Sequence, residues 1–172
     1  MNYFEIFELP VSLVVDQSKL SSQYFVLEEK YSVDPSSNGD EEAHGETLER
    51  SAMVNGGFEV LKDPEKVIKY VLEIKGLLPA NENYQLPEDF LMEMATISKG
   101  LTDGDILNIE EAETKVFQSE KSLYYEVQHI IDGYSDDTIT EGQLLQVKDY
   151  YYRKKYLDGI LERLDGMRNI AG

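Results

Sequence analysis

Apolar side chains recur every three or four positions along most of the chain, the spacing that places them on one face of an α-helix. The first clear example has its apolar positions at Leu20, Tyr24, Leu27 and Tyr31. Asp16 or Ser18, just before it, provides a side-chain oxygen that can cap a helix. We find no alternating segment longer than a few residues. The pattern therefore predicts an all-α protein.

Proline, glycine and loop-forming residues divide this pattern into seven predicted helical segments. Pro10 ends the first segment after one or two turns, and Asp63 with Pro64 begins the fourth. Residues 32–40 read as a loop and residues 102–105 as a turn. The predicted helices span residues 3–9, about 17–31, 41–61, 64–75, 87–99, 106–131 and about 138 onward.

The inward faces of these helices define the predicted core. Gly56 and Gly57 fall inside the third segment, where each costs roughly 1 kcal/mol relative to alanine. From the third segment to the seventh, the predicted inward residues are Leu48, Ala52, Met53, Phe58, Leu61; Val67, Ile68, Val71, Leu72, Ile74; Phe90, Leu91, Met94, Ile97; Ile109, Ala112, Val116, Leu123, Val127, Ile130; and Leu144, Val147, Tyr151, Leu157, Ile160, Leu164.

A domain boundary is predicted where the helical pattern stops after Gly76. The stretch to Leu86 contains Pro79, Asn81 and Asn83, which favour turns over helix. We therefore expect residues 1–76 to form a four-helix portion, residues 77–86 a linker, and residues 87–172 a three-helix portion.

The charge of the chain excludes several classes of partner. It has 34 acidic and 16 basic residues among 172, which gives a formal net charge of −18. Such a charge opposes binding to nucleic acid or to an anionic membrane. No run of 18 apolar residues occurs, so no membrane span is predicted. The start lacks the basic and apolar regions of a signal peptide, and we expect a cytoplasmic protein.

Residues able to carry chemistry are few. There is no cysteine, which excludes thiolate catalysis and cysteine-held metals. His44 and His129 have no organised partners, and the acids of residues 40–46 do not follow a calcium-loop pattern. We expect no metal or cofactor. An enzyme that uses paired carboxylates stays open as an alternative, although acids this abundant are weak support for it.

One segment, residues 150–156, combines aromatic and basic side chains in the order Tyr-Tyr-Tyr-Arg-Lys-Lys-Tyr. Such a mixture can bind single-stranded nucleic acid. The surrounding negative charge opposes that interpretation. A protein-binding face or a packed helical seam is therefore the better prediction.

The order of these segments resembles the HscB family, the J-domain co-chaperones of iron–sulfur cluster assembly, particularly those of Bacteroidetes-type bacteria. The likeness covers nearly the whole chain. The matching segments are residues 3–10 (YFEIFELP), 20–27 (Leu20, Tyr24, Leu27), 51–64, 70–76, 85–94 (QLPEDFLMEM) and 148–157 (KDYYYRKKYL). The resemblance implies an N-terminal J-domain with an antiparallel helix pair, followed by a C-terminal three-helix bundle.

The resemblance also implies a role without covalent chemistry. Family members bring an IscU-type scaffold to a DnaK/HscA-type chaperone and stimulate the ATPase of that chaperone. The implied chaperone-binding residues are Lys30, Ser32, Val33 and Asp34. The implied scaffold-binding residues are Leu91, Met92, Ala95, Thr96 and Tyr156. Met92 falls off the stripe of predicted core residues, which predicts an exposed apolar side chain.

Several positions depart from the family pattern. The family's His-Pro-Asp signature after the second helix is Ser32-Val33-Asp34 here, and Pro35 comes one residue late. A shifted proline does not substitute, because it fixes its own backbone angle and restricts the residue before it. The second helix offers only Lys19 and Lys30 as cations, which weakens attraction to an acidic partner.

Other departures are Gly57 for a frequent alanine, Val67 for a frequent arginine, Ala95 for a larger apolar residue and Thr96 for an acid. Together the changes predict impaired ATPase stimulation. A J-like protein-binding module without chaperone activation is therefore the alternative function.

Overall fold

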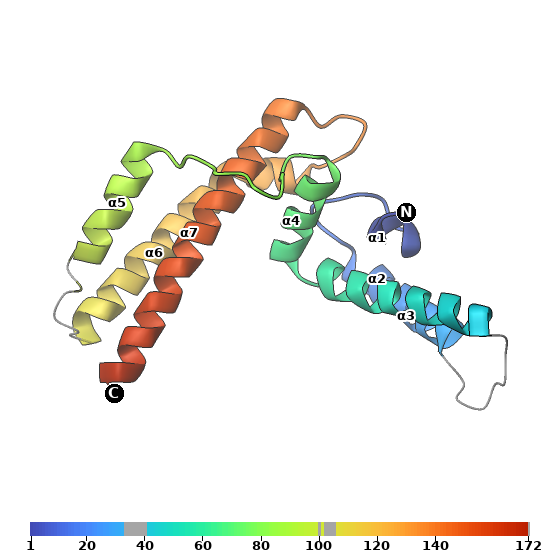
Figure 1. Cartoon of the computed structure of the whole chain (residues 1–172). Helices are drawn as coiled ribbons and strands as arrows, with labels where there is room; N and C mark the ends of the chain where they lie inside the picture. Colours follow the sequence, from blue (N-terminus) through green and yellow to red (C-terminus); the bar gives the residue numbers. More distant parts are fainter. Residues whose placement is uncertain (33–40, 100, 102–105, 172) are drawn as a thin grey trace. The chain divides into compact units, whose positions relative to one another are not determined.

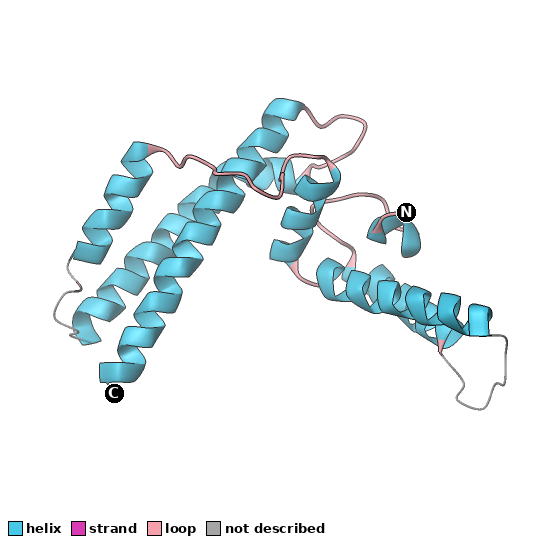
Figure 2. Cartoon of the chain, in the orientation of Figure 1, coloured by secondary structure: helices cyan, strands magenta, loops and turns pink. Residues whose placement is uncertain are grey.

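The computed structural model describes residues 1–32, 41–99, 101 and 106–171. Every regular element in this part of the chain is a helix, as the apolar spacing predicts (Figures 1 and 2). The predicted loop after Ser32 and the predicted turn at 102–105 lie outside the described residues. The helices are α1 (Tyr3–Ile6), α2 (Gln17–Tyr31), α3 (Glu41–Leu61), α4 (Pro64–Ile74), α5 (Glu88–Lys99), α6 (Ile106–Asp132) and α7 (Glu141–Ala171).

The chain divides into two compact units, which we describe separately. The first unit comprises Met1–Leu78 together with Tyr134–Ile139, and the second comprises Pro79–Gly133 together with Thr140–Gly172. The division after Leu78 lies within the stretch 77–86 that the sequence marks as a linker. The placement of 134–139 differs from the prediction, which assigned all of 87–172 to one bundle.

In the first unit, α2 and α3 lie side by side as an antiparallel pair (Figure 1). The Tyr24 ring stacks on Phe58 with centroids 4.1 Å apart, and its hydroxyl donates to Asn55 Oδ1 at 2.8 Å. Asp16 caps α2, and Asp63 caps α4 ahead of Pro64, as predicted. The fully buried side chains of this unit are Phe4, Phe7, Leu20, Leu61, Val67, Val71 and Leu72.

The first helix is one turn long, the shorter of the two lengths that the sequence predicts. Glu8 has a φ of +53°, in the left-handed region that few non-glycine residues adopt. This conformation allows the Leu9 N–H to donate to the Phe4 carbonyl at 2.8 Å, which closes the helix end. The apolar residues after Ile6 therefore belong to a packed turn rather than to a second helical turn.

Gly57 of α3 lies against Tyr3 of α1 and Phe7 just after it. A Cβ at this position would lie 2.9 Å from both Phe7 Cε2 and Tyr3 Cδ1, closer than side-chain atoms tolerate. The Tyr3 ring stacks on the Tyr70 ring with centroids 4.8 Å apart, and the Tyr3 backbone N–H donates to the Tyr70 hydroxyl. The glycine that weakens α3 locally is thus required by the contact with α1.

An ion pair joins the segment 134–139 to the rest of the first unit. Tyr134 is buried, and its hydroxyl donates to Asp136. The Lys75 ammonium, just after α4, lies 2.8 Å from Asp136 Oδ1. Burial raises the pKa of Tyr134, and the hydrogen bond from Lys75 lowers the pKa of Asp136. Periodicity alone does not reveal such a long-range ion pair.

In the second unit, α6 and α7 form a long antiparallel pair, and α5 packs beside α6 (Figure 1). Helix α7 begins at Glu141, not near residue 138, because Thr140 caps it. The Gln143 N–H donates to Thr140 Oγ1, and the Thr140 N–H donates to the Gln143 side chain. The main core cluster is Phe90, Met94, Ile97, Leu101, Ile109, Ala112, Val116, Leu157, Ile160 and Leu164.

Most predicted core residues are buried, and the exceptions concentrate in α3. Leu48 and Ala52 are exposed, whereas Val54 is buried. The inward stripe of α3 runs through Thr47, Ser51, Val54, Phe58 and Leu61, so two of its positions are polar. Elsewhere Ile74 and Leu91 are exposed rather than buried, and Tyr150 is buried where Tyr151 was predicted.

Candidate protein-binding surfaces

The predicted scaffold-binding residues all have exposed side chains on the second unit. Met92 is 65% exposed, as its position off the core stripe predicts, and Leu91 and Tyr156 are each 37% exposed. Along α5, Leu91 shares a side with Ala95, and Met92 shares one with Thr96, because residues four apart lie on the same face. We refer to these four residues and Tyr156 as the α5–α7 surface.

Packing fixes the geometry of the α5–α7 surface. The Tyr156 ring, from the middle of α7, meets the buried Phe90 ring edge to face, with centroids 5.8 Å apart. This contact places Tyr156 beside the first turn of α5. The Thr96 hydroxyl donates to the Met92 carbonyl at 3.0 Å and so projects no free donor of its own. The surface offers apolar contact rather than acid–base chemistry.

A polar cluster, which we call the clasp, fixes the stretch before α5 on α7. The Tyr84 ring stacks on Tyr152 with centroids 4.3 Å apart and an interplanar angle of 6°. The Tyr84 hydroxyl donates to Asp149 Oδ1 at 2.7 Å, and the Tyr152 hydroxyl donates to Glu82 Oε2 at 2.9 Å. Lys148, which is buried, forms an ion pair with Glu82. Residues 82–84 are therefore anchored, although the sequence predicted a linker.

The contacts of the clasp shift the pKa values of Glu82, Tyr84 and Tyr152. The hydrogen bond from Lys148 lowers the pKa of Glu82. Burial, with the hydrogen bond to Asp149, raises the pKa of Tyr84 to about 12. Burial, with the hydrogen bond to Glu82, raises the pKa of Tyr152 to about 12. Much of the aromatic and basic run at 150–156 is thus a packed seam, one of the two arrangements that its composition favours.

The predicted chaperone-binding residues lie at the end of α2 as far as the structure describes them. Lys30 is exposed, with its ammonium 5.3 Å from the centre of the Tyr31 ring. Ser32 follows the last helical residue, and its hydroxyl donates to the Glu29 carbonyl at 3.0 Å. Val33 and Asp34 lie outside the described residues.

Two residues of α2 that the sequence did not single out are apolar and exposed. Phe25 is 69% exposed and Val26 is 60% exposed. Val26 lies on the same side of the helix as Lys19 and Lys30, because seven and four residues are close to whole helical turns. Both residues lie off the helix face that carries Leu20 and Tyr31. That position in the sequence could have predicted their exposure.

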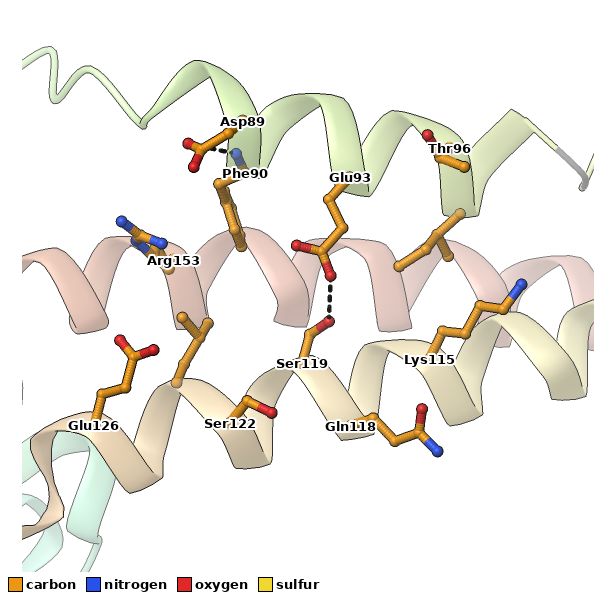
Figure 3. A pocket seen from close by; sticks show the side chains of 12 residues that line it. Asp89, Phe90, Glu93, Thr96, Lys115, Gln118, Ser119, Ser122, Glu126 and Arg153 are labelled. Atoms are coloured by element: carbon orange, nitrogen blue, oxygen red, sulfur yellow. Dashed lines mark hydrogen bonds between the residues drawn. The ribbon is translucent and has the colours of Figure 1, made fainter.

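A groove runs between α5 and α6, and Figure 3 shows the side chains that line it. Its volume is about 640 Å³. The one hydrogen bond drawn across it in Figure 3 joins the Ser119 hydroxyl to Glu93 Oε1 at 3.3 Å. We refer to it as the α5–α6 groove. It lies on the side of α5 opposite Leu91 and Ala95.

Within the described part of the chain, no three His, Cys, Asp or Glu side chains gather as they would around a metal ion. His44 and His129 are both exposed. Among the same residues, no helix combines the length and apolar character needed to cross a membrane.

Comparisons with known proteins agree with these features. No family model matches the chain. A Co-chaperone protein HscB homolog of Vibrio cholerae serotype O1 is 32% identical over 102 residues, 59% of this chain. The homolog of Shewanella amazonensis is 39% identical over 77 residues, or 45% of the chain, and that of Shewanella woodyi is 26% identical over 170, or 96%. The chain spans 60% of the length of the Vibrio relative, 44% of that of S. amazonensis and 97% of that of S. woodyi.

Solved structures extend the likeness to the whole fold. The structure titled Chaperone HscB from Vibrio cholerae matches with a TM-score of 0.72 and 22% identity over all of both chains. That of human co-chaperone protein HscB matches with a TM-score of 0.77 and 20% identity, and covers 98% of this chain and 82% of the human one.

The fold therefore defines a class of protein, in which a J-domain is joined to a helical C-terminal domain. Together with the curated relatives, it shows that the chain is similar to HscB co-chaperones over nearly its whole length, in line with the resemblance of the sequence segments.

Proposed function

We propose that the chain is a co-chaperone adaptor of iron–sulfur cluster assembly. It binds an IscU-type scaffold through the α5–α7 surface and brings it to a DnaK/HscA-type chaperone, without covalent chemistry of its own. In this proposal residues 1–76 act as the J-domain, residues 87–172 as the scaffold-binding bundle, and the protein works in the cytoplasm. The names of the relatives support this assignment.

The observation that carries the proposal is the exposure of the apolar side chains of Leu91 and Met92 on α5 and of the Tyr156 ring on α7. A methionine with 65% of its surface exposed gains nothing from the core of its own domain. Flexible apolar side chains next to an aromatic ring are typical of protein-binding centres. The packing of Tyr156 on Phe90 holds the aromatic part of the surface in place.

Calorimetric titration with an IscU-type scaffold tests this site. We expect Met92→Ala and Tyr156→Ala each to weaken binding by about tenfold, the usual effect of truncating an interface anchor. Phe117→Ala is the matched control, since Phe117 is 55% exposed on α6, outside this surface. Equal binding by the wild type and both surface variants would exclude the α5–α7 surface as the site.

A second candidate function is a protein-binding module that no longer activates the chaperone. The observation that favours it is the composition of α2 and the residues after it. Ser32-Val33 stands where the family has His-Pro, and exposed Phe25 and Val26 adjoin only two lysines. The chaperone's ATPase rate separates the two candidates, because an activator raises this rate and a simple binding module leaves it unchanged.

A further inference from the structure

The α5–α6 groove has an apolar floor and small side chains on one wall. Phe90 and Ile97 of α5, both buried, and the partly buried Leu123 of α6 line it. On the α6 side, Ser119 and Ser122 occupy positions that face the groove (Figure 3). Because serine side chains are short, they leave open a space that larger residues would fill. The groove is therefore a hollow over apolar groups rather than a closed helical seam.

A second hollow adjoins the groove and lies between α6 and α7, where Gly142, Leu145 and Asp149 are among its lining residues. This hollow has a volume of about 370 Å³, shares Leu123 and Glu126 with the first, and extends to Val127. From Lys115 to Val127, α6 rises by about 18 Å, at 1.5 Å per residue. That length matches a helical segment of about 12 residues. Along α6 the two hollows together thus span about three helical turns.

Carboxylates dominate the rim. Asp89, Glu93 and Glu126 are exposed along it. The two cations that line the groove already form ion pairs on their own helices. Lys115 Nζ lies 3.0 Å from Glu111 Oε1, and Arg153 Nε lies 2.6 Å from Asp149 Oδ2. Negative charge above an apolar floor complements a segment in which lysine or arginine flanks apolar side chains.

We propose that the α5–α6 groove is a second docking site, which binds a basic amphipathic helix of a partner protein. Apolar side chains of that helix pack over the partly buried Leu123, and its cations meet Glu93 and Glu126. The site shares Thr96 with the α5–α7 surface but none of its apolar residues Leu91, Met92 and Tyr156, and it does not depend on the function proposed above. A second copy of this chain is a poor occupant, because each copy carries a net charge of −18.

The probe is a synthetic 14-residue amphipathic helix of leucine and lysine, titrated into the full chain, with a leucine–glutamate peptide of the same pattern as its counterpart. We expect the lysine peptide to bind and the glutamate peptide not to bind. Ser122→Leu fills the groove without changing the charge, and we expect it to weaken binding by at least about tenfold.

Charge variants separate the groove from the general negative surface. We expect Glu93→Gln with Glu126→Gln to weaken binding by about tenfold, since each lost ion pair contributes a few-fold. Glu110→Gln with Glu162→Gln removes the same charge from exposed positions outside the groove, and its effect should stay below about twofold. Met92→Ala should leave binding unchanged.

Three results would overturn the proposal. The first is no binding of the lysine peptide, or equal binding of the glutamate peptide. The second is unchanged binding by Ser122→Leu or equal loss in the two charge pairs, which would mean nonspecific attraction. The third is loss of binding by Met92→Ala, which would place the peptide on the α5–α7 surface.

Discussion

The two units are stabilised in different ways. In the first, the single turn of α1 packs its rings directly on the backbone of α3 at Gly57, and Tyr70 stacks over Tyr3. In the second, long helices are kept apart by aliphatic side chains such as Ile109, Leu157 and Leu164. An added methyl group at Gly57 therefore meets the Tyr3 and Phe7 rings, whereas one at Gly159 of α7 meets nothing within 4 Å.

The two proposed partner sites also differ in how well the structure supports them. The α5–α7 surface is built on regular helices, with Tyr156 held by Phe90 and the preceding stretch held by the clasp. The described part of the chaperone-binding site lies at the end of α2, where the family's charged and signature residues are largely replaced. Scaffold binding thus has the stronger structural support.

The largest effect is expected for Gly57→Ala. The added methyl group would press on the Tyr3 and Phe7 rings, and we expect a loss of about 2 kcal/mol in the free energy of unfolding. Urea denaturation measures this loss. Gly45→Ala is the control in the same helix, because nothing lies within 4 Å of its added Cβ. Equal stability of Gly57→Ala and the wild type would mean that α1 does not pack this tightly on α3.

The next effect concerns the clasp of the second unit. Tyr152→Leu removes the stack on Tyr84 and the hydrogen bond to Glu82, and we expect it to cost about 1.5 kcal/mol. Tyr125→Leu, at a residue that is 78% exposed, should change the same free energy by less than about 0.5 kcal/mol. The same loss in both variants would show that the clasp contributes nothing.

A smaller effect of opposite sign is expected for Gly159→Ala in α7. No atom lies within 4 Å of the added Cβ, so the change only improves helix propensity. We expect a gain of about 0.5–1 kcal/mol, measured by the same denaturation. A loss of stability here would contradict the open space around the Gly159 Cβ position.

The pH dependence of the clasp should be the smallest effect. Because the pKa of Glu82 is lower in the folded chain than its ordinary value of 4.5, its contribution to stability is present above that value. Stability is lost as the pH falls through the lowered pKa. Glu82→Gln should therefore show a shallower fall in stability below pH 4.5. The same slope in both proteins would contradict the ion pair with Lys148.

At high pH the dependence of stability on pH has the opposite sign, because stability falls as the pH rises. The pKa values of Tyr84 and Tyr152 are raised to about 12, so their contribution is complete below the ordinary value of 10.0. It is lost as the pH rises toward 12.

The sequence predicted the long helices well because their cores are continuous apolar stripes. In α6, five of the six predicted inward residues are buried and Leu123 is partly buried. In α3 the prediction failed at Leu48 and Ala52, because polar Thr47 and Ser51 lie on the inward stripe. The end of α1 depends on the backbone conformation of Glu8, which residue type alone does not indicate.

The exposure of Met92 was predictable because its position relative to the core stripe decides it. The clasp and the α5–α6 groove were not, since both depend on which residues distant in sequence meet. Nothing local links Glu82 to Lys148, or Glu93 to Ser119. The roles of Lys30, Ser32, Val33 and Asp34 stay predictions from the family resemblance.

The most direct test of the adaptor function is the ATPase rate of a DnaK/HscA-type chaperone in the presence of an IscU-type scaffold. We expect the wild-type chain to raise this rate weakly and Ser32→His with Val33→Pro to raise it several-fold more. Adding Met92→Asp to that variant should remove most of the scaffold-dependent increase. No stimulation by the restored variant, or stimulation that is indifferent to Met92→Asp, would contradict a chain that links the two partners.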